Sequence, residues 1–101
     1  MKINKKFFLI FTHYKYIINN NFYFDELKVL DLFGGTGNHS YEFISRGCKD
    51  VTYVDKFGGC LRFVKAISEK LEIEDEITII KSDVFKFIRF TKIQYNYIFA
   101  G

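Results

Sequence analysis

One stretch, residues 29–37, constrains the fold of this chain more than any other. It reads Val-Leu-Asp-Leu-Phe-Gly-Gly-Thr-Gly, so an apolar run that ends in a carboxylate passes directly into a glycine-rich turn. This order is typical of a strand whose carboxyl end opens into a ligand crevice and is followed by a helix. Gly35 and Gly37 can adopt positive φ angles and let a ligand lie against the backbone. The first turn of the following helix offers free N–H groups.

Asp31 distinguishes this turn from a plain phosphate-binding loop. A pyrophosphate held here would meet the negative charge of Asp31, whereas a ligand with an ammonium group would be attracted to it. S-adenosylmethionine carries such an ammonium, together with a carboxylate and an adenosine. The alternative is an acid that simply ends a strand, and the offset of the glycines favours the ligand role.

The segment Asp31-Leu32-Phe33-Gly34-Gly35-Thr36-Gly37 resembles motif I of the class I S-adenosylmethionine-dependent methyltransferases. Its Phe-x-Gly-Thr-Gly form is similar to the RsmD-like family, which methylates guanine N2 of small-subunit ribosomal RNA. The resemblance runs from Tyr14 to Ala100 and includes three further segments, Asn19-Asn20-Asn21-Phe22, Ser45-Arg46-Gly47 and Ser82-Asp83-Val84. It implies S-adenosylmethionine as the cofactor, ribosomal RNA as the partner, and direct transfer of the sulfonium methyl to an exocyclic amine.

Composition limits what else the chain can be. At 101 residues it is one small domain with a modest core, and a hydrophobic fraction of 49% excludes a disordered character. The net charge is +3, but residues 1–24 hold four lysines and no acid, which leaves 11 basic and 12 acidic residues in the rest. The basic bias therefore belongs to the N-terminal arm, and the remainder is not a basic nucleic-acid face. We expect a cytoplasmic protein, because no segment is long enough to span a membrane.

Strand and helix patterns alternate along the chain. Short apolar runs predict strands, and amphipathic segments between them predict helices. The strands are 28–33, 51–54, 77–80 and 95–100, and the helices are 38–46, 57–71 and 84–90. The helix over 57–71 presents one apolar side, with Ser68 on the polar side and Leu71 on the apolar one. Gly47 is in place to end the helix over 38–46.

This alternation predicts an α/β fold with a Rossmann-like parallel sheet and helices on both faces. The family resemblance implies the strand order 3-2-1-4, without the C-terminal strands of the full methyltransferase fold. We expect residues 25–101 to form a partial S-adenosylmethionine-binding domain, preceded by an N-terminal arm or leading helix over 1–24. Cys48 and Cys60 lie twelve residues apart and make neither a metal site nor a redox motif, so we expect small buried thiols.

Two further acids follow strands. Asp55 ends the second strand, where a carboxylate can accept hydrogen bonds from both ribose hydroxyls of an adenosine. Asp83 follows the third strand and resembles the family acid near the adenine edge, although the N-cap of the next helix is an equally good use for it. With Phe33 packed beneath the cofactor, the expected cofactor-binding residues are Asp31, Phe33, Gly34, Gly35, Gly37, Asp55, Asp83 and Val84. His39 is a conceivable general base, but a helix-terminus position near solvent is the simpler reading.

The chain departs from the family after Ala100. There the family continues with Asp-Pro-Pro and an aromatic residue, which hold the target amine and stack on the base. Here Gly101 stands at the position of that acid, and the sequence contains no proline. We therefore expect a truncated, cofactor-binding part of a methyltransferase that is inactive alone and that either self-associates through an exposed edge of its fourth strand or needs a partner segment there.

Two other function classes remain open. The first is a non-catalytic Rossmann-like binding module that keeps the fold without the chemistry. The second is a nicotinamide-dinucleotide-binding domain, whose Gly-x-Gly-x-x-Gly pattern would need a glycine where Ser40 stands. Asp31 also disfavours the second class, because it would face the pyrophosphate.

Overall fold

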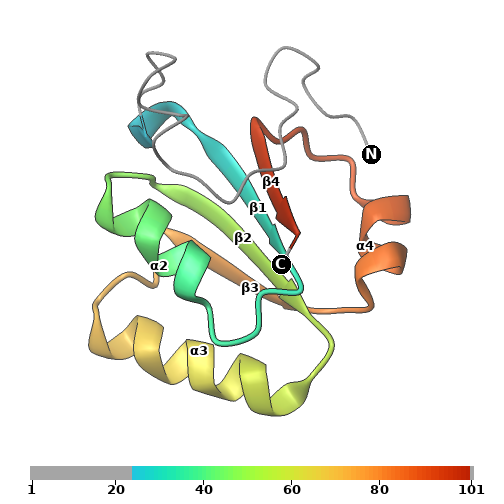
Figure 1. Cartoon of the computed structure of the whole chain (residues 1–101), viewed down its shortest axis with the longest axis horizontal. Coiled ribbons are helices and arrows are strands. Elements are labelled where there is room, and N and C mark those ends of the chain that lie inside the picture. The colour runs from blue at the N-terminus through green and yellow to red at the C-terminus, as the bar shows by residue number, and fades with distance from the viewer. Residues whose placement is uncertain (1–23, 101) are drawn as a thin grey trace.

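The computed structural model describes residues 24–100, in which four parallel strands form one sheet with helices on both faces (Figure 1). The elements in chain order are η2 (Phe24–Glu26), β1 (Lys28–Leu32), α2 (Asn38–Ser45), β2 (Asp50–Asp55), α3 (Gly58–Lys70), β3 (Ile77–Lys81), α4 (Val84–Phe90) and β4 (Tyr97–Ala100). The strand order β3-β2-β1-β4 confirms the expected order. β1 and β2 are therefore the central strands. The prediction for the N-terminal arm falls on residues that, apart from Phe24, lie outside the described ones.

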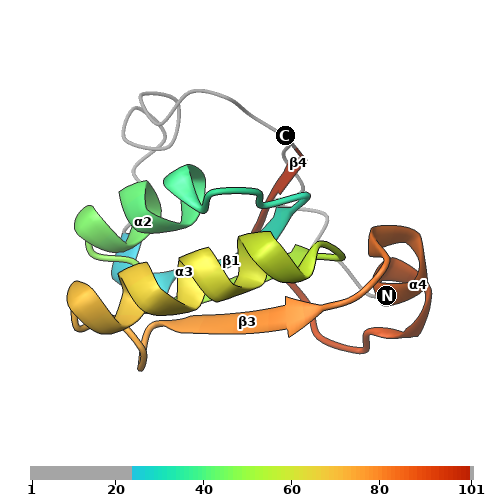
Figure 2. The same ribbon diagram turned by 90° about the horizontal axis from the view of Figure 1, so that it is seen from below.

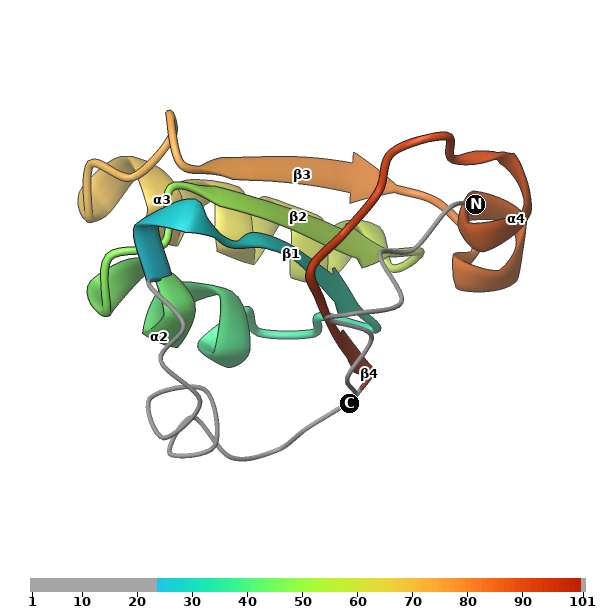
Figure 3. The same ribbon diagram turned by 90° about the horizontal axis from the view of Figure 1, so that it is seen from above.

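Alternation along the strands divides the core between the two faces of the sheet. On one face Val29 and Val51 pack against Phe43 of α2, and Tyr53 packs against Val64 of α3. On the other face buried side chains of β1, β2 and β4 pack against α4. Figure 2 shows α2 and α3 side by side along the strands, and Figure 3 shows α4 beyond the arrowhead of β3. The helices α2 and α3 thus cover one face of the sheet, and α4 covers the other.

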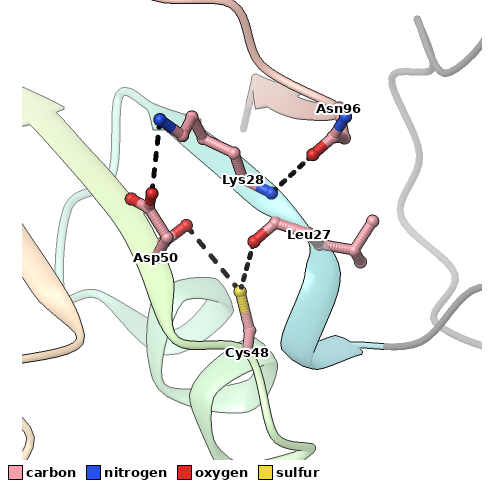
Figure 4. Close-up of polar contacts among 5 residues, drawn as sticks. All are labelled: Leu27, Lys28, Cys48, Asp50 and Asn96. Carbon is pink, nitrogen blue, oxygen red and sulfur yellow. Dashed lines mark hydrogen bonds and ion pairs between the residues drawn. The ribbon is translucent and has the colours of Figure 1, made fainter.

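The amino ends of the strands are joined by a small polar cluster (Figure 4). The Lys28 backbone N–H donates to Asn96 Oδ1 at 2.8 Å, and the Asn96 N–H donates to the Lys28 carbonyl at 2.8 Å. The buried Cys48 thiol donates to the Leu27 carbonyl at 3.4 Å and lies 3.8 Å from the Asp50 carbonyl oxygen. Burial raises the pKa of this thiol to about 11. The prediction of a small buried thiol is confirmed for Cys48, whereas Cys60 is partly exposed.

Four sequence expectations need correction. Phe33 was expected in the first strand, but its φ of 55° ends β1 at Leu32. The helical spacing predicts Ser68 on the polar side of α3, but this residue is buried, and its hydroxyl donates to the Val64 carbonyl at 2.7 Å and so needs no water. The same spacing predicts Leu71 on the apolar side, but this residue is 54% exposed, since it follows the last residue of α3. β4 begins at Tyr97 and not at residue 95.

Gly47 follows α2 with a φ of 107° and ends that helix as the sequence predicts. In residues 24–100 none of the helices combines the length and the hydropathy needed to cross a bilayer. The same residues contain no cluster of histidine, cysteine, aspartate or glutamate suited to a metal ion.

Candidate functional site

The turn between β1 and α2 lies over the carboxyl ends of the two central strands (Figure 1). Gly35 and Gly37 have φ angles of 55° and 86°, which confirms the expected positive values. The Gly34 N–H donates to the Val54 carbonyl at 3.1 Å and anchors the start of the turn on β2. The Gly37 N–H donates to the Gly34 carbonyl at 2.9 Å and closes it. The backbone path is therefore held by its own hydrogen bonds and leaves no room for side chains at two of the glycines.

Two tyrosines that the sequence reasoning missed fill that space. A Cβ atom at Gly34 would lie 2.3 Å from the ring of Tyr53, whose hydroxyl donates to the Gly35 carbonyl. A Cβ atom at Gly37 would lie 2.6 Å from the hydroxyl oxygen of Tyr41. Tyr53 stands opposite Asp31 in the register of β1 and β2, so the parallel pairing is the signal that could have located it. The turn is braced by one ring from β2 and one from α2.

Asp31 lies within β1 and not at its end, because the strand continues to Leu32. It is only 1% exposed, and its Oδ2 accepts a hydrogen bond from the Ser40 hydroxyl at 2.7 Å. Burial raises the pKa of Asp31 to about 6, and nearby Asp55 acts in the same direction, while hydrogen bonding from Ser40 opposes the rise. A carboxylate removed from water in this way gains strongly from a cationic partner.

Asp55 is the last residue of β2, as predicted, and is 7% exposed. Its Oδ2 accepts the Gly35 N–H at 3.0 Å, and its Oδ1 accepts the Phe57 N–H at 3.0 Å. A carboxylate offers about four lone-pair positions, so each oxygen of Asp55 keeps acceptor capacity for a ligand hydroxyl. Asp55 therefore joins the turn before α2 to the turn before α3 and orients its own carboxylate.

Asp83 and Val84 lie at the start of α4. The Asp83 Oδ1 accepts the Lys86 N–H at 2.9 Å, so the N-cap role considered for this residue is present. Its side chain is exposed, whereas the side chain of Val84 is buried in the core on the α4 face. A ligand contact from Val84 would have to come from its backbone. The adenine role of this pair stays a prediction.

Exposed phenylalanine rings follow three of the strands. Phe33 comes after β1 and is 48% exposed, and its ring meets that of Phe85 edge-on at a centroid distance of 6.1 Å. Phe57 comes after β2 and Phe85 after β3, and both are more exposed than Phe33. Phe33 is a predicted site residue, and the sequence analysis had no role for the other two. Apolar surface thus gathers at the carboxyl edge, next to the buried acids.

His39 begins α2 together with Asn38, and its environment differs from the expected one. The imidazole lies against the ring of Phe99 in β4 with a centroid distance of 3.6 Å. Partial burial lowers the pKa of His39 from its ordinary value. The residue packs α2 onto β4 and is not simply a solvent-facing helix terminus.

Comparison with known proteins gives the same family from sequence and the same fold from structure. A family model described as Conserved hypothetical protein 95 matches residues 2–101. An uncharacterized methylase of Rickettsia prowazekii is 26% identical over 90% of this chain and 38% of its own length. The Escherichia coli protein yhhF, which carries a provisional methyltransferase name, has a TM-score of 0.77 and 16% identity over 86% of this chain and 47% of its own.

A third relative shares more of its sequence over a shorter stretch. It is a SAM-dependent methyltransferase from Agrobacterium tumefaciens, 36% identical over 62% of this chain and 20% of its own, with a TM-score of 0.57. The chain spans less than half the length of each of these three relatives. The resemblance read from the turn at residues 31–37 is confirmed at the level of family and fold.

Proposed function

The chain belongs to the family described as Conserved hypothetical protein 95, and from this premise we propose that it binds S-adenosylmethionine and forms the cofactor-binding part of a methyltransferase. The observation that carries the proposal is the pair Asp31 and Asp55, two buried carboxylates on neighbouring central strands with the glycine turn between them. Asp31 would repel a pyrophosphate, whereas an acid in the position of Asp55 binds ribose hydroxyls in nicotinamide-cofactor folds as well. A ligand with an ammonium at one end and ribose hydroxyls at the other fits them.

Each part of the site has a distinct task in this proposal. Asp31 attracts the ammonium of the methionine moiety, directly or through water. Asp55 accepts hydrogen bonds from the ribose hydroxyls while its backbone contacts to Gly35 and Phe57 keep it oriented. Positive φ angles at Gly35 and Gly37 keep the turn free of side chains where the cofactor lies against the backbone. S-adenosylmethionine supplies the electrophilic methyl group.

The rings of Phe33, Phe57 and Phe85 offer apolar surface for the adenine. Asp83, at the start of α4, is placed to accept from the exocyclic amine, because a capping carboxylate keeps acceptor capacity beyond its one bond to Lys86. The capping and the ligand role of Asp83 are therefore compatible.

The substrate proposed for the complete enzyme is small-subunit ribosomal RNA, with guanine N2 as the methyl acceptor. It rests on the Phe-x-Gly-Thr-Gly form of the turn and on the family match. Proximity and orientation of the amine and the sulfonium would supply most of the rate acceleration. Gly101 stands where the family carries the acid that binds the target amine, so we expect this chain alone to bind the cofactor without transferring its methyl group.

Calorimetric titration of the 101-residue chain separates the candidate functions. We expect saturable binding of S-adenosylmethionine and no measurable binding of NAD. Preference for NAD would overturn the proposal in favour of a dinucleotide domain, and binding of neither ligand would favour a non-catalytic module. Methyl transfer to small-subunit RNA by the purified chain, above a control without protein, would contradict the expectation of inactivity.

We further propose that the chain self-associates through β4. This strand pairs with β1 on one side, and no strand of the described part lies on its other side. An edge with free backbone groups is a template for pairing with another chain. Sedimentation at a chain concentration on the order of tens of micromolar should show dimers or larger species. A stable monomer would contradict the proposal.

A further inference from the structure

Ser40 lies in the first turn of α2 and is fully buried. Its hydroxyl donates to Oδ2 of Asp31, itself 1% exposed, at 2.7 Å. In the sequence Ser40 stood out only because it replaces the last glycine of a dinucleotide pattern. In the structure its hydroxyl binds Asp31, the more deeply buried of the two acids of the site.

The groups that face Asp31 can be named element by element. Tyr41 faces it from α2, and Tyr53 and Asp55 face it from β2. Phe99, its register partner on β4, does not ionise. Burial raises the pKa of both tyrosines, so they stay neutral at neutral pH and below. Two groups of Ser40 favour the charged form of Asp31, the hydroxyl with the larger effect and the backbone N–H with the smaller, and Asp55 opposes that form.

We propose that Ser40 is a positioning residue whose hydroxyl keeps Asp31 ionised and thereby sets the lowest pH at which the site accepts the ammonium group of S-adenosylmethionine. The inference rests on the proposed function, in which Asp31 attracts that ammonium. It assigns Ser40 no contact with the reacting atoms.

The direction of the effect follows from the burial of Asp31. Burial raises the pKa of Asp31 to about 6 despite the opposing hydrogen bond from Ser40. A protonated carboxyl attracts a cation weakly, so affinity should fall about tenfold for each pH unit below this pKa. Removal of the Ser40 hydroxyl removes the larger of the two opposing contributions and leaves that of the backbone N–H, so the pH at which binding weakens should rise.

The chain contains a matched control for this change. Ser68 in α3 is as buried as Ser40, and its hydroxyl also donates one hydrogen bond of 2.7 Å, but to the Val64 carbonyl. Ser40→Ala and Ser68→Ala therefore delete the same buried group from a helix. They differ in whether the acceptor is Asp31.

The test measures the affinity for S-adenosylmethionine from about pH 5 to about pH 7.5, below the range in which the ligand's own amino group titrates. The wild-type affinity should be constant above pH 6 and fall below it. In Ser40→Ala the curve should move up by about one pH unit, the scale of one hydrogen bond to a charged group, which weakens binding about fivefold at pH 6 and about tenfold at pH 5. In Ser68→Ala the curve should keep the wild-type midpoint.

A second measurement decides the matter if Ser40→Ala does not fold. Carbon-13 NMR of the wild-type side-chain carboxyl groups should show Asp31 titrating near pH 6 without ligand, and binding at that pH should release about half a proton. An Asp31 that titrates near its ordinary value of 3.8 would overturn the inference. Equal midpoint shifts in Ser40→Ala and Ser68→Ala would also overturn it.

The two proposals fail in different ways. Wild-type binding that is strong and unchanged across the whole pH range overturns the role of Ser40 and leaves the cofactor assignment standing. Absence of wild-type binding at every pH, with Asp31 still titrating near pH 6, overturns the cofactor assignment and, with it, the role of Ser40 in binding.

Discussion

The two ends of the sheet handle their polar groups in opposite ways. At the amino end, Asn96 and the Lys28 backbone bind each other, the Cys48 thiol binds the Leu27 carbonyl, and the Lys28 ammonium pairs with Asp50 (Figure 4). At the carboxyl end, Asp31 and Asp55 are buried beside a glycine turn, and the pKa of Asp31 is raised. The amino end uses polar groups to hold the strands together. The carboxyl end holds the buried carboxylate of Asp31, whose charge is only partly balanced by the hydrogen bonding from Ser40.

This difference shows how a site can be told from a structural cluster in one small fold. Polar groups that satisfy one another stabilise the native state and leave nothing for a ligand. A buried carboxylate with a raised pKa lowers stability at neutral pH, which a protein tolerates where function requires it. Substitutions at the carboxyl end should therefore change ligand binding, whereas substitutions at the amino end should change stability alone.

The largest effect is expected from Gly37→Val. The φ of 86° is poorly tolerated by a β-branched residue, and the added Cβ would meet the Tyr41 hydroxyl. We expect loss of S-adenosylmethionine binding and destabilisation by about 1–3 kcal/mol, measured by calorimetry and denaturant unfolding. Gly59→Val is the control, because a Cβ atom there would make ordinary contact at 3.8 Å. Wild-type affinity in Gly37→Val would remove the turn from the site.

Asp31→Asn should change affinity and stability in opposite directions. The variant loses the charge that attracts the ammonium, so binding should weaken by about 1.5–3 kcal/mol. The pKa of Asp31 is higher in the folded chain than in the unfolded chain, so the folded state holds the proton of Asp31 more tightly. The stability that this proton contributes is therefore fully present below pH 3.8 and is lost as the pH rises to about 6. Above pH 6 the variant should therefore exceed the wild type by up to about 3 kcal/mol.

Denaturant unfolding at several pH values measures this difference. The gain of the Asp31→Asn variant should appear between pH 4 and pH 6 and then stay constant. A variant less stable than the wild type at pH 7 would show that the charge of Asp31 is compensated within the chain.

Asp55→Ala should weaken binding by about 1.5–3 kcal/mol, the scale of hydrogen bonds to a charged group. The variant also loses the contacts to the Gly35 and Phe57 N–H groups, so a modest loss of stability should accompany the weaker binding. Titration with methionine alone provides the internal control, because a ribose contact has no counterpart in that fragment. Unchanged affinity for S-adenosylmethionine would remove the ribose role of Asp55.

The smallest effect on the site is expected from a change at the other end of the sheet. Cys48→Ala removes a buried thiol with its contact to the Leu27 carbonyl and should lower the free energy of unfolding by about 1–2 kcal/mol. The affinity for S-adenosylmethionine should stay within a factor of two or so of the wild type, since additivity holds for distant sites. A change in affinity as large as that of Asp55→Ala would show that the two ends are coupled.

Much of the fold could be predicted from the sequence because strands and helices alternate with distinct hydrophobic periods. The same holds for the positive φ angles of Gly35 and Gly37 after β1 and for the position of Asp55 at the end of β2. Ser40 could not be predicted, because its task depends on which face of β1 Asp31 occupies. That face is set by the pairing of Asp31 with Tyr53, which lies 22 residues further along the chain.

The incorrect sequence expectations for Ser68 and Phe33 have a related cause. Ser68 satisfies its hydroxyl within its own helix and can therefore be buried, although its residue type favours the surface. Phe33 adopts a positive φ that its residue type does not predict, because the hydrogen bond from Gly34 to Val54 fixes the path of the turn. Residue type alone does not report such local compensation.

The separation of Lys28 and Asn96 along the chain has a consequence for the order of assembly. Their paired hydrogen bonds span 68 residues, whereas Asp31, Ser40, Tyr53 and Asp55 fall within 25 consecutive positions. During synthesis, β1, β2 and α2 emerge from the ribosome long before β4, and contacts close in sequence form first. We expect the segment from Asp31 to Asp55 to fold on the nascent chain while the edge of β1 that later pairs with β4 is still unpaired. Ligand binding at that stage would favour the correct pairing of the strands that follow.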